Sequence, residues 1–258
     1  MKITVLGCGT SSGVPQIGCH CPVCLSTDPK NKRLRASILV EQGETAVLFD
    51  CGPDMRMQLL TADVGRLDAL VFTHAHADHT HGIDDIRGIN NAMDAVLPAY
   101  GDPLVLDQIR GRFDYAFHPD RHPGGGFWRP SLDPRPFEGP FDVGSLHIVP
   151  FRQRHGRTDS WGFRIGEFAY STDADWLDEE AFATLAGIRW WIVDCLRERP
   201  HPTHAHLERT LGWIERLGPE RAWLTHMNHE VDYDTWCGRL PAHVRPAYDG
   251  QMIDTEGA

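Results

Sequence analysis

The chain has 258 residues, 41% hydrophobic and 24% charged, so it can bury a sizeable core and its composition excludes a disordered protein. Its formal net charge of −11 predicts an acidic surface that repels nucleic-acid backbones, so we expect no extended nucleic-acid partner. The same charge still permits a small anionic ligand held through divalent ions, because such ions dominate the local field.

Short apolar or alternating runs, most of them bounded by Gly, Pro or Asp, predict strands along the chain. In chain order we expect strands at Lys2–Leu6, Ser37–Val40, Ala46–Phe49, Ala69–Phe72, Leu146–Pro150, Phe163–Ile165, Phe168–Tyr170, Trp190–Val193 and Arg221–Leu224. A period near 3.6 residues predicts helices at Asp54–Leu60, Glu179–Leu185 and Leu207–Leu217. This mixture indicates an α/β layered architecture, and without repeats or linkers we expect one domain over residues 1–258.

Residues 112–140 break this pattern, because they are rich in Pro, Gly and aromatic residues. A structureless stretch of this length inside a compact domain is usually functional or mobile. Two interpretations stay open. The segment is either a surface excursion, or a lid over an active site that carries Tyr115, His118, Phe127 and Trp128.

The N-terminus and the cysteines bear on the compartment. One Lys and a five-residue apolar stretch are too short for a signal peptide, and no run of about 18 apolar residues predicts a transmembrane helix. We therefore expect a cytoplasmic protein with no membrane partner. Seven cysteines, an odd number, argue against a disulfide framework in such a chain.

The strongest chemical signal is the motif THAHADH at residues 73–79, which follows an apolar run and so lies at a strand end. Open α/β sheets place their sites at such ends. Three imidazoles and a carboxylate are costly to bury without partners, and divalent metals are suitable partners. His74 and His76 point the same way in an extended chain, whereas Asp78 and His79 turn towards a second ion.

Three further residues of ligand type follow strand-like runs in the same manner. His155, Asp173 and His226 each come at or just after the end of such a run. One isolated His or Asp at a strand end is usually structural. Four such events in order indicate a metal centre, and a solvated His-rich loop is the weaker interpretation.

This series resembles the signature of the metallo-β-lactamase superfamily, from the first strand to about His229. The resemblance implies an αββα four-layer sandwich and two catalytic divalent metals, Zn or Mn, since the ligands suit both. It assigns one metal to His74, His76 and His155, the other to Asp78, His79 and His226, and Asp173 to both. Asp50 matches an earlier acidic position of the family, and is either a support for a metal-bound histidine or a turn cap.

A second cluster, CHCPVC at residues 19–24, predicts one separate structural zinc, because three thiolates and a fourth ligand form a closed tetrahedral site. The fourth ligand is either His20 or a distant residue. The cluster and the HxxH pair at 226–229 resemble the phosphoribosyl cyclic phosphate phosphodiesterases of phosphonate breakdown. That resemblance implies Cys19, Cys21, Cys24 and His229 as ligands. The pyrroloquinoline quinone biosynthesis protein has a similar cluster, and a group of merely buried or reactive thiols is the alternative.

Two metals about 3.5–4 Å apart bridge a water and lower its pKa, so we expect the bridging hydroxide to attack phosphorus. We predict Asp78 and His204 as catalytic residues, because the resembling phosphodiesterases carry a general-acid histidine just before a helix. The residue two positions on is often acidic in that family, whereas it is His206 here. A solvated Pro/His loop is the other interpretation. Candidate substrate contacts are Ser11 and Ser12 in a loop after the first strand, Arg87, and His206.

The expected function is hydrolysis of small cyclic or nucleotide-like phosphodiesters, and a homodimer is the assembly that the resemblance implies. The alternatives are other hydrolyses in the same superfamily, on lactams, thioesters or transfer-RNA precursors, and a non-catalytic zinc-stabilised binding protein. The acidic charge and the lack of a basic arm count against transfer RNA. The cysteine cluster counts against a lactamase, and the complete ligand set counts against a binding protein.

Overall fold

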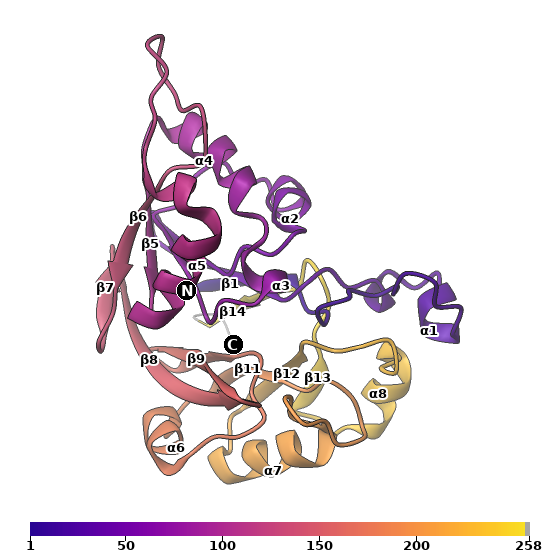
Figure 1. Ribbon diagram of the computed structural model, residues 1–258. Helices are drawn as coiled ribbons and strands as arrows, with labels where there is room; N and C mark the ends of the chain where they lie inside the picture. The colour runs from indigo at the N-terminus through magenta and orange to yellow at the C-terminus, as the bar shows by residue number, and fades with distance from the viewer. Residues whose placement is uncertain (256–258) are drawn as a thin grey trace.

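Two seven-stranded sheets stack face to face in the computed structural model, which describes residues 1–255 (Figure 1). The first sheet has, in spatial order, β14 (Met252–Asp254), β1 (Lys2–Gly7), β2 (Ser37–Gln42), β3 (Thr45–Phe49), β4 (Ala69–Val71), β5 (Leu97–Gly101) and β6 (Leu132–Pro136). The second has β13 (Val244–Pro246), β12 (Arg221–Thr225), β11 (Trp190–Asp194), β10 (Phe168–Ser171), β9 (Thr158–Ile165), β8 (Leu146–His155) and β7 (Phe141–Val143).

Helices cover the outer faces of the sheets. The helices of the described residues are α1 (Pro22–Leu25), α2 (Met55–Thr61), α3 (Ala77–Thr80), α4 (Ile86–Met93), α5 (Pro103–Phe113), α6 (Glu179–Leu185), α7 (Leu207–Leu217) and α8 (Tyr233–Arg239), with 3-10 turns η1 (Pro29–Asn31), η2 (Ile83–Asp85) and η3 (Asp114–Phe117). Figure 1 shows α2, α4 and α5 on one side of the stacked sheets and α6 and α7 on the other, while the α1 segment projects from the body. The predicted αββα sandwich is therefore confirmed.

The strand β3 shows how the sequence builds these layers. Its side chains alternate between faces, so Val47 and Phe49 pack between the two sheets, whereas Leu48 packs among the residues of α2, α4 and α5. The Phe49 ring lies 5.3 Å from that of Phe163 in the second sheet. Each such buried side chain contributes on the order of 1.5–3 kcal/mol, so both faces of the sheet stabilise the sandwich.

Parallel pairing brings strand ends to one edge. In the first sheet β3, β4, β5 and β6 pair in parallel, and in the second β10, β11, β12 and β13 do so. The motif at 73–79 follows β4, while Asp173 follows β10 and His226 follows β12. Ligands bind at the carboxyl ends of strands in open α/β sheets, and here the fold gathers the predicted ligands there.

The prediction of a structureless stretch at 112–140 is wrong at its ends, which form helix and strand, whereas residues 118–131 contain no helix or strand. The range contains the end of α5, η3 and β6. All of its residues are described, and none of them lines the cavity at the predicted ligands. Pro134 and Pro136 fit within β6 because it is an edge strand, where a missing N–H costs no ladder bond. The loop before β6 instead packs on α4, since Phe127 N donates to Asn91 Oδ1 at 2.7 Å. The lid interpretation therefore has no support in the structure.

Within residues 1–255 we find no helix of the length and apolarity needed to span a bilayer.

Gly52, directly after β3, packs against the backbone of the metal motif. A Cβ atom at Gly52 would overlap the carbonyl oxygen of Asp78, so Gly52→Ala must displace one or both segments. We expect a loss of about 1–3 kcal/mol or more in the free energy of unfolding. Gly212→Ala in α7 is the matched control. It meets no described atom within 4 Å and should instead stabilise the helix by roughly 0.5–1 kcal/mol. Urea unfolding of both variants checks this, and an unchanged midpoint for Gly52→Ala would contradict it.

Candidate metal centre

The first group of candidate ligands combines the two sheets. His74 and His76 come from the loop after β4, His155 ends β8, and Asp173 follows β10. One ligand atom of each lies within 4.8 Å of those of the others. Burial lowers the pKa of His74, His76 and His155, which keeps the three imidazoles neutral. Neutral imidazole nitrogens are what a divalent metal requires of histidine.

The second group contains Asp78, His79, Asp173 and His226, again with ligand atoms within 4.8 Å of one another. Asp173 faces both groups. Its Oδ2 lies 3.7 Å from His74 Nε2 and 3.6 Å from His155 Nε2. Its Oδ1 lies 3.1 Å from His79 Nε2 and 3.3 Å from His226 Nε2. One carboxylate therefore offers a separate oxygen to each group, which is the arrangement of a bridging ligand.

Unpaired polar atoms test whether these residues fit metal ions. The Nε2 atoms of His79 and His226 are buried and make no hydrogen bond to the residues described. Burial alone would raise the pKa of Asp173, but the neighbouring imidazoles of His226, His79 and His74 outweigh it and hold the pKa well below its usual range. Ionised carboxylate oxygens and imidazole nitrogens suit Zn and Mn, so the donor set fits divalent ions at both groups.

Hydrogen bonds from neighbouring residues hold the candidate ligands in position. Asp50 Oδ2 accepts from His79 Nδ1 at 2.6 Å, and its Oδ1 accepts from Thr73 N at 2.8 Å. This contact agrees with Asp50 as a support for a metal-binding histidine. Asp50, Asp173 and His226 have positive φ angles of 62°, 53° and 58°, each just after a strand. Left-handed conformations at non-glycine residues concentrate at functional sites, where the surrounding structure maintains the strain.

His204 lies beside the two groups. Its Nδ1 is 3.1 Å from Asp194 Oδ2, and its Nε2 is 3.9 Å from Asp173 Oδ2. Burial would lower the pKa of His204, but the carboxylates of Asp194 and Asp173 outweigh this and raise it to about 9. The imidazole can therefore carry a proton at neutral pH. Sequence reasoning missed Asp194, although it ends a predicted strand just as the other acidic candidates do.

The candidate ligands open onto a cavity of about 670 Å³. Its lining is Ser11, His76, Asp78, His155, Gly156, Arg157, Thr158, Asp173, His201, Pro202, Thr203, His204 and His226. Ser11 therefore lies where a substrate contact was expected. The sequence analysis did not predict Arg157, Thr158 and Thr203 as cavity residues, because they belong to none of the motifs considered. The proximity of Arg157 to His155 in the chain was the available signal.

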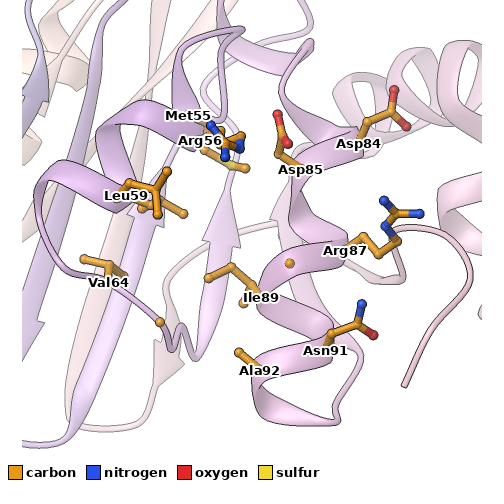
Figure 2. Close-up of a pocket in the computed structure, with 13 residues that line it drawn as sticks. Met55, Arg56, Leu59, Val64, Asp84, Asp85, Arg87, Ile89, Asn91 and Ala92 are labelled. Carbon is orange, nitrogen blue, oxygen red and sulfur yellow. The ribbon is translucent and has the colours of Figure 1, made fainter. Parts of the chain in front are cut away.

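The other candidate substrate contacts lie elsewhere. Ser12 Oγ donates to Gly13 O at 3.3 Å, and His206 is not among the cavity's described lining residues. Arg87 lines a separate cavity of about 420 Å³ between α2 and α4. Figure 2 shows Arg87 at the rim of this cavity and Leu59 and Ile89 facing each other across it. Arg87 Nη1 donates to Trp128 O at 3.2 Å.

The cysteine cluster gathers away from this cavity. The Sγ atoms of Cys19, Cys21 and Cys24 lie within 4.8 Å of one another. Of the two candidate fourth ligands, His20 is exposed, whereas the carbonyl of His229 accepts from Cys21 Sγ at 3.7 Å. His229 Nδ1 is buried with no hydrogen bond to a described residue, although the ring is not grouped with the thiols. The donor set fits zinc, and Cys19, Cys21, Cys24 and His229 stay the predicted ligands.

Cys24→Ser tests this second centre. A serine hydroxyl is a poor zinc ligand, so we expect the variant to lose one zinc per chain. A site saturated about 1,000-fold over its Kd contributes about 4 kcal/mol, and we expect a loss of that order in stability. Cys237→Ser is the matched control, because Cys237 lies outside the cluster. Metal analysis and thermal unfolding provide the readout, and equal zinc content in both variants would contradict the prediction.

Comparisons with known proteins agree with this architecture. Residues 45–227 match the model of the β-lactamase superfamily domain. The octanoyltransferase of Porphyromonas gingivalis is 37% identical over 100% of this chain and 52% of its own length. The ribonuclease Z of Bradyrhizobium diazoefficiens is 32% identical over 52% of this chain and 45% of its own. The chain thus spans about half the length of these relatives.

One solved structure covers nearly the whole chain. A diphosphatase from the PhnP family is 33% identical and superposes with a TM-score of 0.90, over 98% of this chain and 96% of that one. Two stacked sheets between helices, with histidine and aspartate ligands at their shared edge, define the class of αββα metal-binding proteins. Within that class, the chain belongs to the metallo-β-lactamase superfamily, close to the PhnP family.

Proposed function

We propose that this protein is a metal-dependent hydrolase that cleaves small phosphodiesters. The observation that carries the proposal is the position of Asp173, whose two carboxylate oxygens face two separate groups of imidazoles. A pair of divalent ions in these groups would polarise a phosphoryl oxygen and make a water nucleophilic near neutral pH. Zn and Mn both suit the ligands, and with the cysteine site we propose about three metals per chain.

The chain's own residues would orient the substrate and manage its protons. Asp78 and Asp173 are held ionised, since neighbouring imidazoles keep the pKa of each well below its usual range. His204, fixed by Asp194, lies 3.9 Å from Asp173 and lines the same cavity. It is placed to donate a proton to a leaving oxygen, as a general acid does.

Phosphorus chemistry has support from the comparisons and from the shape of the site. One similar structure is a diphosphatase and one relative is a ribonuclease Z, and both names denote cleavage of phosphate linkages. A cavity of about 670 Å³ is within the range of small-molecule pockets. The net charge of −11 disfavours a long nucleic acid, so a small substrate fits better than a transfer-RNA precursor.

Acyl chemistry has less support, although one relative is named an octanoyltransferase. Fatty acyl chains bind in pockets with apolar walls. The described lining of this cavity contains no Leu, Ile, Val, Met, Phe, Tyr or Trp, so nothing there would bury an eight-carbon chain.

A substrate panel tests the proposed function. Protein reconstituted with Mn or Zn would be offered bis-p-nitrophenyl phosphate, cyclic nucleotides, a lactam and a thioester. We expect chelator-sensitive hydrolysis of the phosphodiesters above the others. Faster turnover of the lactam or the thioester would overturn the substrate class. No turnover together with one tightly held zinc would favour a binding protein.

A further inference from the structure

The candidate ligand His226 differs from the other buried histidines of the two ligand groups in how its ring is held. The others have a hydrogen-bonding partner within 2.9 Å of Nδ1: His74, His79 and His155. His226 Nδ1 is buried and makes no hydrogen bond to a described residue, although its ring stacks on that of His204 with centroids 4.5 Å apart. Metal-binding histidines are usually oriented through their second ring nitrogen. The place of His226 therefore depends on this stacking and on the backbone that carries it.

That backbone is the segment 226–232 between β12 and α8, which contains no helix or strand. It starts against the N-terminal loop, where Met227 N donates to Cys8 O at 2.9 Å. A tight turn follows, in which Val231 N donates to Asn228 O at 3.3 Å. The turn begins two residues after His226, so whatever fixes the turn also restrains the histidine.

Arg33 binds both ends of this turn from inside the protein. Its Nη1 donates to Asn228 O at 3.2 Å, and its Nη2 donates to Val231 O at 2.7 Å. The side chain is only 1% exposed, and within residues 1–255 it belongs to no ion pair. A buried guanidinium is costly unless its donors are satisfied, and here backbone carbonyls satisfy them in place of a counter-ion. Arg33 is itself fixed, because it exchanges backbone hydrogen bonds of 2.7 and 2.9 Å with Val14.

We propose that Arg33 is a positioning residue for the second ligand group, because it holds the turn after His226 and so places this imidazole for a divalent ion. The inference rests on the metal centre of the proposed function, and Arg33 is not among the described residues that line the cavity. The histidines of the first ligand group come from the loop after β4 and from β8, outside the segment that Arg33 binds. Losing Arg33 should therefore weaken one ion of the pair and spare the other.

A manganese titration of chelator-treated protein tests this inference. Two adjacent manganese ions give an exchange-coupled electron paramagnetic resonance spectrum, whereas one isolated ion gives six lines. Thiolates bind manganese poorly, so the cysteine cluster does not contribute. In Arg33→Met we expect the first ion to bind as in the parent, and the Kd of the second to rise about 10- to 100-fold. Arg33→Lys offers one ammonium group to two carbonyls, so we expect a rise of about 3- to 10-fold, and this variant carries the test where Arg33→Met does not fold.

Arg164→Met is the matched control. Arg164 Nη1 also donates to two backbone carbonyls, Thr184 O at 2.6 Å and Ala186 O at 2.8 Å, and it does not line the cavity. We expect this control to lose thermal stability, as the Arg33 variants do, while it binds both ions as the parent does. A coupled spectrum at the parent's manganese concentrations in the Arg33 variants, or an equal weakening of both ions, would overturn the positioning role.

The titration also separates this inference from the proposed function, because it needs no turnover. Failure of the parent to hydrolyse any phosphodiester would overturn the substrate class alone. Where turnover occurs, excess manganese should restore the rate of Arg33→Met to within about 3-fold of the parent, since occupancy of the second site is what the variant lacks. A parent protein that never shows a coupled pair would overturn the dinuclear centre and the role of Arg33 together.

Discussion

Replacing Asp173 by Asn is expected to lower phosphodiester hydrolysis on the order of 10³-fold or more. Each of the two Asp173 oxygens faces one ligand group. In asparagine an amide nitrogen replaces one of these oxygens, so one group loses its anionic ligand. Metal ions contribute several kcal/mol of charge stabilisation in such transition states, and each 1.36 kcal/mol corresponds to a tenfold change in rate. Initial rates with bis-p-nitrophenyl phosphate and added manganese, together with metal content, provide the measurement.

Asparagine is the informative replacement because Asp173 has a φ of 53°. Asn tolerates the left-handed region, whereas Ala would add backbone strain to the loss of the ligand. Asp63→Asn is the matched control, since Asp63 is exposed and has nearly the same φ, 54°. We expect the control to match the parent in rate and stability. An Asp173→Asn protein within a few-fold of the parent rate would remove Asp173 from the chemistry.

Much of the site could be predicted because ligands follow strand ends. β4 and β10 are short runs of buried residues and β12 is mostly buried, and the sequence pattern identifies all three although it misses some boundaries by a residue. The polar residues after these runs lie at one edge because the strands pair in parallel. Local pattern alone therefore identified residues that are far apart in sequence and adjacent in space.

The elements that were missed have sequences whose local signal contradicts their tertiary role. β5 (LPAYG) and β6 (LDPRP) contain proline, which usually disfavours a strand, and their pairing with neighbouring strands overrides that signal. The helix α5 begins at Pro103 after an Asp102 cap, a start signal that we did not use. Tertiary pairing cannot be read from a short window, so the regular structure at the two ends of residues 112–140 was missed.

The sequence could not predict contacts that depend on the direction in which a side chain points. His204 and His206 are two residues apart, yet His204 lines the cavity whereas His206 does not. Arg87 follows the metal motif closely in sequence, but α4 directs it to a different cavity. Asp194 and Arg157 have no short motif, because their positions at the site arise from which loop lies opposite them. The sequence therefore indicated which residues are candidate metal ligands, but it could not indicate which side chains line the cavity.

His204→Gln is expected to slow hydrolysis of a phosphodiester with an alkoxide leaving group by about 10²–10⁴-fold. An alkoxide is a strong base that leaves only when it receives a proton. The carboxylates of Asp194 and Asp173 raise the pKa of His204 to about 9, so the imidazole is protonated at neutral pH. p-Nitrophenolate leaves without a proton, so the same variant should lose only a few-fold with bis-p-nitrophenyl phosphate. The ratio of the two rate losses is the measurement.

This ratio also distinguishes a proton donor from a metal ligand. His204 has a ligand atom within 4.8 Å of those of Asp194 and His226, so a role in holding an ion is the competing explanation. A metal ligand would matter equally for both leaving groups, and its loss would lower the metal content. His147→Gln is the matched control, because His147 also pairs with a carboxylate, Asp142 Oδ1 at 2.6 Å, but is exposed and lies outside the cavity. Equal losses for both substrates, with less bound metal, would overturn the general-acid role of His204 and leave the dinuclear centre with an additional ligand.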